Sequence, residues 1–304
     1  MNPIFAGQNR GRMPPRVKSL PDAGEKRARE DDMLRSSDLF IESVETGEAG
    51  EAAAPIRFSD PERVWLEGFD AVRAAGDTGG YHSVLCGEIW LSPPEDRGRL
   101  SRALRALVSQ YRRRMHRADD GAPILVAGLG TERMAADALG PRTAARILAS
   151  TDEMRRAGMS AVCAVKTGIP RETGMDTASL VKALARETGA SLIVTVDSLT
   201  ARSRERLGTL VQITDCGVTP GSALAHSSGE ISARTMPGPV LSLGVPTVIR
   251  SDVLAGETAD DPMFVSRADT DAMVTAYARI LAAAINGAFS GNAAGNGIIG
   301  APDA

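Results

Sequence analysis

The chain has 304 residues, of which 43% are hydrophobic and 24% charged, enough for one large domain or two small ones. A formal net charge of -3 gives no reason to expect nucleic-acid binding, and no signal peptide or apolar stretch long enough to span a bilayer is evident. Three scattered cysteines argue against a disulfide framework and fit a reduced cytoplasm, so we expect a cytoplasmic protein with no membrane partner.

The first 35 residues differ from the rest of the chain. They combine four prolines with a run of charges from Glu25 to Asp32. Such a segment has little apolar surface to offset the entropy lost on ordering, so we expect a flexible leader. Beyond it, residues 80–92 are typical of a short hairpin or strand pair. Residues 100–115 have the three- and four-residue apolar spacing of a helix.

From residue 124 onward, short β-branched runs alternate with helical patterns. Strands are expected at 124–127, 161–165, 191–196, 209–213 and 240–243, and helices near Pro141, over 177–187 and over 269–289. Near-continuous apolar runs are typical of strands covered on both faces. Their alternation with helices favours a doubly wound α/β sheet. The Gly- and Asn-rich residues 291–304 are expected to form a disordered tail.

Two aspartates sixty residues apart, Asp137 and Asp197, each follow an apolar, strand-like run. Strand ends of such a sheet line the crevice where ligands bind. Two carboxylates in one cleft can activate a water and protonate a leaving group, which makes hydrolysis the first hypothesis. Each could instead be a helix cap, Asp137 for the helix after Pro141 and Asp197 for the segment from Ser198. Asp215, which ends a third strand, is a further acid or a turn residue.

Other chemistries have weaker support. Gly128 and Gly130 follow a strand, but Arg133 stands where the dinucleotide fingerprint needs a third glycine. Cys216 and His226 could form a nucleophile–base pair, although a small buried thiol is the commoner explanation. The nucleophile elbow of serine hydrolases and the His or Cys motifs of metal sites are absent from the sequence. A metal site made of the two aspartates alone stays open, and no cofactor is expected.

Five motifs in a fixed order then give a specific resemblance. They are Gly128-x-Gly-x(6)-Asp137-Ala-Leu-Gly-Pro, Thr173-Gly-Met-Asp-Thr177, Val196-Asp197-Ser-Leu-x-Ala-Arg-Ser203, Gln212-Ile-Thr-Asp-x-Gly217 and Leu243-Gly-Val-Pro-Thr-Val248. Together they resemble the germination protease family of spore-forming bacteria, over about residues 121–289. A weaker match, Arg35-Ser-Ser-Asp38-Leu39-Phe-Ile-Glu42, lies near the start of the chain.

The resemblance implies a three-layer α/β/α fold with a mixed, mostly parallel sheet, like that of the hydrogenase-maturation peptidases. It implies an aspartic-type endopeptidase of small acid-soluble spore proteins, in which Asp137 and Asp197 are catalytic. Glu172, Thr173 and Asp215 are supporting candidates. One catalytic aspartate would act as base on water and the other, protonated, as acid; which is which stays open. The alternatives are a metal-dependent processing peptidase and an inactive binding relative.

The resemblance also implies a zymogen that removes its own leader, by a cut after an acidic residue and before an apolar one. Cleavage is therefore predicted between Asp38 and Leu39. This divides the chain into a propeptide at 1–38, an N-terminal segment with short β elements and a helix at 39–120, a catalytic core at 121–290 and a tail at 291–304.

Two departures from the family bear on assembly and substrate choice. The long insertion usual after the Gly-Val-Pro-Thr segment is replaced by a short loop at 249–262, and Arg171-Glu172 stand where the family has a smaller, uncharged pair. Family members are tetramers, so the resemblance implies a homotetramer as one possible assembly, which the shortened loop leaves open. It also implies spore proteins as substrates and no direct nucleic-acid partner.

Overall fold

The structure is a computed structural model of the chain, and the residues it describes belong to one compact unit that spans residues 36–304. The described ranges are 38–42, 59–76, 79–115, 122–150, 161–221, 229–255 and 263–289. The leader up to residue 37, the tail, His226 and much of the loop at 249–262 lie outside these ranges, so the predictions made for them stay predictions.

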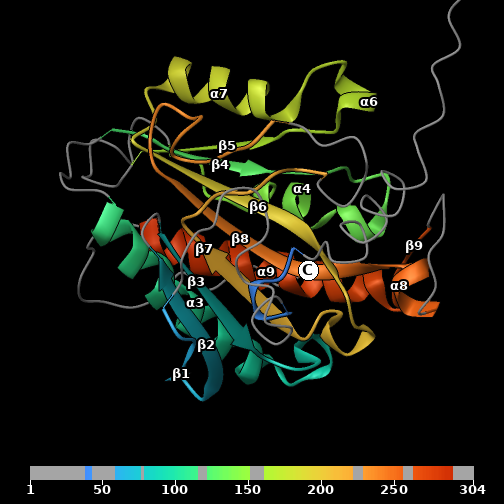
Figure 1. Cartoon of the computed structure of the whole chain (residues 1–304). Coiled ribbons are helices and arrows are strands. Elements are labelled where there is room, and N and C mark those ends of the chain that lie inside the picture. The colour runs from blue at the N-terminus through green and yellow to red at the C-terminus, as the bar shows by residue number, and fades with distance from the viewer. Residues whose placement is uncertain are drawn as a thin grey trace, which may run out of the picture. The chain divides into compact units, whose positions relative to one another are not determined.

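All the described strands belong to one mixed, nine-stranded sheet with the order β1-β2-β3-β7-β8-β6-β4-β5 and with β9 paired to β8 (Figure 1). In chain order they are β1 (Glu62–Leu66), β2 (Phe69–Gly76), β3 (Gly79–Leu85), β4 (Ile124–Gly128), β5 (Val162–Lys166), β6 (Leu192–Ala201), β7 (Leu210–Thr214), β8 (Val240–Arg250) and β9 (Phe264–Val265). The strands β8, β6, β4 and β5 run parallel to one another, and the remaining pairings are antiparallel.

Helices cover both faces of the sheet, which confirms the predicted three-layer α/β/α architecture. They are α3 (Pro94–Met115), α4 (Leu139–Ala144), α6 (Pro170–Thr173), α7 (Thr177–Thr188), α8 (Ser251–Ala255) and α9 (Thr270–Phe289), with short 3-10 turns η1 (Ile89–Leu91), η2 (Ala135–Asp137) and η3 (Arg204–Arg206). The helices α3, α4 and α9 contribute to the core on one face, whereas α7 lies over the opposite face (Figure 1).

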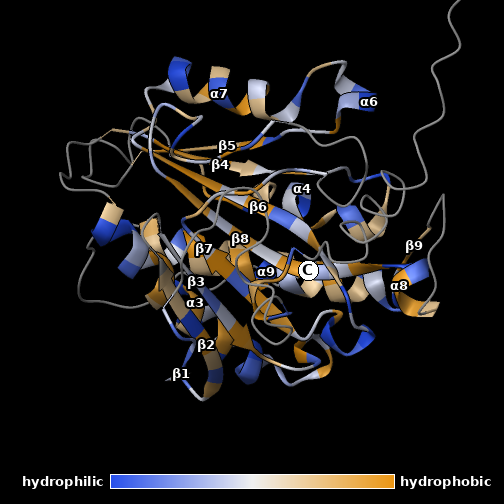
Figure 2. Cartoon of the chain, in the orientation of Figure 1, coloured by the Kyte–Doolittle hydropathy of each residue, from blue (hydrophilic) through white to orange (hydrophobic). Residues whose placement is uncertain are grey.

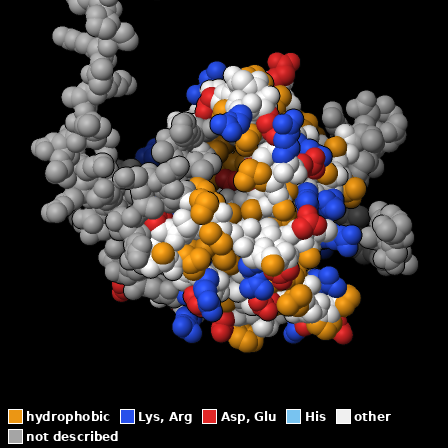
Figure 3. Space-filling model, turned by 90° about the vertical axis from the view of Figure 1, so that its right-hand side faces the viewer, with side chains coloured by type: hydrophobic (Ala, Val, Ile, Leu, Met, Phe, Trp, Pro, Cys, Tyr) orange, Lys and Arg blue, Asp and Glu red, His pale blue; other side chains and the backbone are white. Residues whose placement is uncertain are grey.

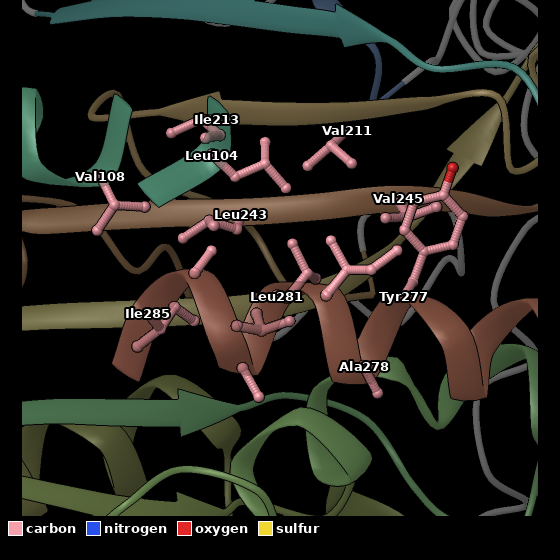
Figure 4. Packing of buried hydrophobic residues seen from close by; sticks show 14 of the residues in the cluster. Leu104, Val108, Val211, Ile213, Leu243, Val245, Tyr277, Ala278, Leu281 and Ile285 are labelled. Carbon is pink, nitrogen blue, oxygen red and sulfur yellow. The ribbon is translucent and has the colours of Figure 1, made fainter. Parts of the chain in front are cut away.

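The alternation of side chains along β6 divides the core between the two faces. Leu192, Val194 and Val196 belong to the larger cluster with α3 and α9, whereas Ile193 belongs to the cluster with α7. This is the period of two expected of a strand buried on both sides. Figure 2 shows hydrophobic colour along much of the central strands. In Figure 4, side chains of α9 such as Leu281 point toward those of β8 and α3.

The predicted strand pair at residues 80–92 is wrong in detail. Residues 79–85 form the single strand β3, which pairs with β2 and β7, and Ile89–Leu91 form the turn η1. The helix predicted at 100–115 begins earlier, at Pro94, because proline fits the first turn of a helix and Glu95 and Asp96 complement its dipole.

The last helix, α9, bears on the prediction that no stretch of the chain is long and apolar enough to span a bilayer. By length and composition alone, α9 could cross a membrane. However, most of its apolar residues are buried against α3, α4 and the sheet, which is what the core helix of a globular unit requires. We therefore assign α9 to the core.

A short segment near the start, residues 38–42, is built into the body of the unit. Leu39 and Ile41 are buried in an apolar cluster with residues of β6, β7 and β8. The ring of Phe40 stacks on that of Tyr81 with 4.8 Å between centroids. The carboxylate of Glu42 accepts hydrogen bonds from the amides of Arg202 and Ser203. We call these residues the 38–42 segment.

Candidate active site

A tight turn after β4 positions Asp137. Gly130 has φ of 100°, and a Cβ at this position would lie 2.7 Å from the Asp137 carboxylate, so only glycine fits. The turn lets the amide of Thr131 donate to Asp137 Oδ2 at 3.0 Å. Thr247 of β8 donates to the carbonyl of Ala136 at 2.7 Å and fastens η2 to the sheet. These two hydrogen bonds fix the position of the Asp137 carboxylate and of the backbone just before it.

The alternative that each aspartate caps a helix is wrong. The helix α4 begins at Leu139, and its N-cap residue is Ala138, which makes no side-chain capping bond. Asp197 lies inside β6, which continues to Ala201 instead of ending at the last apolar residue. The strand continues because Asp197 keeps its place in the ladder with β8, where Gly244 is its partner.

Asp137 and Asp197 line the same cavity, which has a volume of about 550 Å³. Its walls are largely apolar, with contributions from Leu129, Met134, Ile169, Val218, Val248 and Phe264. A cavity of this size with a few polar groups at its base is the usual form of a small-molecule or peptide site. Figure 3 shows a hollow in the surface with an acidic side chain at its bottom and hydrophobic side chains on its rim.

The surroundings of the two carboxyls raise the pKa of both. Burial raises the pKa of Asp137 to about 6; the hydrogen bond from Thr131 opposes this effect, and the charge of Glu172 adds to it. Burial also raises the pKa of Asp197 well above its ordinary value, and the nearby charges of Asp137 and Asp38 raise it further. Both side chains open into the cavity, but protein atoms surround them on most sides. The two groups are therefore unequal acids.

Glu172 lies in a hydrogen-bonded network next to Asp137. It accepts a bond of 2.7 Å from the hydroxyl of Thr131, and its Oε1 lies 3.1 Å from Nε of Arg133. The amide of Arg133 donates in turn to the Thr131 hydroxyl at 3.2 Å. Glu172 thus helps to hold the loop whose backbone binds Asp137, and its charge acts on the pKa of that carboxyl.

Asp38 joins the cavity from the opposite end of the chain. Its Oδ2 accepts a hydrogen bond of 2.8 Å from the amide of Thr200 on β6, and its own amide donates to the Thr200 carbonyl at 3.3 Å. Its carbonyl accepts a bond of 2.8 Å from the side chain of Gln212. The predicted cleavage site therefore lies beside the two predicted catalytic aspartates.

None of the three supporting candidates, Glu172, Thr173 and Asp215, is among the residues that line the cavity. The hydroxyl of Thr173 bonds to carbonyls of Ile169 and Met175 at the end of α6. The carboxylate of Asp215 accepts from the amide of Gly80 at 2.6 Å and so joins β7 to β3.

The geometry gives no support to the cysteine alternative. Cys216 does not line the cavity, and burial raises the pKa of its thiol, which opposes formation of the nucleophilic thiolate. As for metals, no group of three or more His, Cys, Asp or Glu side chains suited to hold an ion occurs within the part of the chain that the structure describes.

Fold and site together define an α/β protein with two carboxyls of raised pKa in one cavity beside parallel strands. The germination protease family model matches residues 77–266, more than half of the chain. The chain therefore belongs to the germination protease family.

Individual relatives agree. A germination protease from Clostridium acetobutylicum is 28% identical over 247 residues, which cover 76% of this chain and 73% of that protein. Germination proteases from a Geobacillus species and from Priestia megaterium are 34% and 33% identical over segments that span 45% and 46% of this chain. Those segments cover only 38% and 40% of these two relatives. Among solved structures, a NiFe hydrogenase maturation protease, HycI, from Thermococcus kodakarensis is 17% identical, with a TM-score of 0.36 over 59% of this chain and 98% of its own.

Sequence reasoning missed two features of the site. Thr131, whose amide binds Asp137, lies between the turn glycines and the aspartate and carries no pattern of its own. Gln212 begins one of the five motifs, so its position was marked, but its role depends on a contact with residues far away in the sequence.

Proposed function

We propose that the chain is an endopeptidase in which Asp137 and Asp197 activate a water to hydrolyse peptide bonds of small acid-soluble spore proteins during germination. The observation that carries the proposal is that these two aspartates, singled out sixty residues apart, line one cavity with raised pKa values. Membership of the germination protease family supports a peptide as substrate.

Because the surroundings of Asp137 and Asp197 differ, we assign the two carboxyls different roles in the reaction. Asp137, with a pKa of about 6, is ionised at neutral pH and serves as the general base toward water. Asp197, whose pKa is raised by burial and by the charges of Asp137 and Asp38, is assigned the protonated role: it polarises the scissile carbonyl, then donates its proton to the leaving amine. Two interacting carboxyls titrate as a pair, so the measured pKa values belong to the dyad.

The cavity suits a cut between an acidic and an apolar residue. Its walls are apolar, and Arg171 is the cation among the described residues that line it. An apolar side chain after the cut gains by burial, and an acidic side chain before it gains from the positive charge. We propose that the chain's own Asp38–Leu39 bond is also cut, which makes the protein a self-processing zymogen; there the Asp38 carboxylate is bound by the Thr200 amide and Leu39 is buried in the cluster with β6, β7 and β8.

A cleavage assay tests this function. The purified full chain and its Asp137→Asn and Asp197→Asn variants are incubated with an acidic spore protein at pH 5 to 8, and products are identified by mass. Loss of either aspartate is expected to reduce the rate on the order of 10² to 10⁴-fold. Asp271→Asn, an exposed aspartate at the start of α9, is the matched control and is expected to retain the rate.

The same assay separates the alternatives. Loss of cleavage with a chelator, restored by a divalent metal, would support the metal-dependent peptidase. An absence of cleavage at every pH, in trans and at Asp38, would support the inactive binding relative. Activity that survives in either aspartate variant would contradict the proposed mechanism.

Two further features rest on the family resemblance. We propose a location in the cytoplasm of the spore core and assembly as a homotetramer. Fractionation of spores and light scattering of the purified protein test these two proposals independently of the chemistry.

A further inference from the structure

We infer that Gln212 is a catalytic residue for removal of the leader: its side-chain amide holds the Asp38–Leu39 peptide and stabilises the oxyanion that forms at the Asp38 carbonyl. This inference rests on the proposed self-cleavage. The inference adds a third catalytic group, the side-chain amide of Gln212 in β7, which contacts the reacting bond.

The side chain of Gln212 bonds to both sides of the predicted scissile peptide. Its Nε2 donates to the carbonyl oxygen of Asp38 at 2.8 Å, and its Oε1 accepts from the amide of Phe40 at 2.7 Å. The Asp38–Leu39 bond lies between these two contacts. One amide group thus fixes the position of the carbonyl to be attacked and of the chain that follows it.

The sheet places Gln212 and Asp197 on the same face, the face on which the 38–42 segment contacts Gln212. Gly244 of β8 is the ladder partner of Gln212 on β7 and of Asp197 on β6, so the three residues form one row across the sheet. Residues paired in a row project from the same face, and two strand spacings separate the outer pair by roughly 10 Å. The middle member has no side chain, and the side chain of Leu199 packs over it, between Gln212 and Asp197.

Further contacts hold the segment on this face. The Thr200 amide binds the carboxylate of Asp38 at 2.8 Å, and Leu39 is fully buried. The Glu42 carboxylate is bound by two backbone amides beyond the end of β6. Because both sides of the bond are fixed, the reacting groups need little further ordering, a condition under which intramolecular reactions are strongly accelerated.

The chemistry can be written with Gln212 in place. Asp137 takes a proton from water as the water oxygen bonds to the Asp38 carbonyl carbon, and the negative charge that forms on the carbonyl oxygen is stabilised by the Gln212 N–H. The C–N bond to Leu39 then breaks, and Asp197 supplies a proton to the leaving nitrogen. The products are a carboxylate at Asp38 and an amino terminus at Leu39. A preorganised donor of this kind contributes about 10² to 10³-fold to rates of acyl transfer.

The test follows self-cleavage of the full chain by intact mass. Gln212→Met, which keeps the volume but removes the donor, is expected to lower the first-order rate about 10²-fold. Ser83→Ala is the matched control: Ser83 is the ladder partner of Gln212 on β3, is fully buried, and has a hydroxyl with no hydrogen-bond partner among the described residues. This control is expected to keep the wild-type rate.

A second measurement separates catalysis from docking. Hydrogen exchange at the Thr200 amide reports whether the 38–42 segment still lies in place. Slow cleavage with a protected Thr200 amide supports the inference, whereas a rate within threefold of wild type overturns it. An exposed Thr200 amide together with slow cleavage also overturns it, because Gln212 would then serve only to anchor the segment.

The outcomes distinguish this inference from the proposed function. If wild type is cut after Asp38, Asp197→Asn is not, and Gln212→Met is cut normally, only the role of Gln212 fails. If wild type is never cut at this bond, the role of Gln212 and the proposed self-processing fail, whereas the endopeptidase activity is tested separately by cleavage of the spore protein in trans. If Gln212→Met does not fold, Gln212→Asn, whose shorter amide withdraws the donor from the carbonyl, is measured with the same expected result.

Discussion

Asp137 and Asp197 carry the same functional group but differ in what surrounds it. Asp137 is bound by the amide of Thr131, a contact that favours the charged form and limits the rise in its pKa to about 6. Asp197 has two carboxylate neighbours, Asp137 and Asp38, whose charges oppose its ionisation. In the proposed mechanism, these neighbours, and not the residue type, distinguish the base from the acid.

A change in the charge of Glu172 offers a way to alter the pKa of Asp137 without substituting Asp137 itself. Glu172→Gln keeps the size and can still accept from Thr131, but it removes a negative charge that raises the pKa of Asp137. We expect the acidic limb of the kcat/KM profile to shift to lower pH by a few tenths of a unit, with little change in the maximum rate. A pH profile of the variant measures the shift; a large fall in kcat without a shift would contradict a role through charge.

At the scale of single residues, the sequence predicts which residues carry the chemistry but not which residues lie next to them in the fold. The two aspartates were recognised because each follows an apolar run within an ordered motif. The contacts of Asp38 with Thr200 and Gln212 join residues more than 160 positions apart, and no local pattern encodes such a pairing. Asp38 was predicted as a cleavage point, and its place beside Asp197 became visible only in the fold.

The turn that follows β4 is the element on which the site depends most. Gly130→Ala would place a methyl group against Asp137 in a left-handed backbone conformation, which costs about 1 to 2 kcal/mol before the clash is counted. We expect a lower thermal midpoint and at least a tenfold loss of cleavage rate. Gly98→Ala, inside α3 with only a distant arginine atom nearby, is the control and is expected to stabilise the chain slightly.

Elements with strong periodicity were predicted well. The strands β4 to β8 and the helices α7 and α9 follow from apolar runs and helical spacing, because burial on two faces leaves a clear pattern. The strands β1 and β2 were missed, since β1 has exposed and half-buried residues and neither has a strong apolar run. The extension of β6 past Asp197 was missed because a charged residue usually ends a buried strand. The extension of β8 past Leu243 to Arg250 was missed because Gly244 and Pro246 usually mark the end of a strand.

For the whole molecule, the buried carboxyls lower stability at neutral pH. The pKa of Asp137 is raised in the folded state, so its ionisation opposes folding; this penalty is absent below pH 4 and complete above about pH 6. Asp137→Asn is therefore expected to stabilise the chain by about 1 to 3 kcal/mol at pH 7.5 and by almost nothing at pH 3.5. Thermal unfolding at pH 7.5 and at pH 3.5 measures the difference, and equal effects at the two pH values would contradict a carboxyl whose pKa is raised by burial.

The pH dependence of cleavage tests the central claim, that the two aspartates divide the roles of base and acid, most directly. The account predicts that kcat/KM on a peptide with an acidic–apolar cleavage site rises through about pH 6 as Asp137 ionises and falls at higher pH as Asp197 loses its proton. A rate that keeps increasing toward pH 3, or that does not change with pH between 4 and 9, would contradict it.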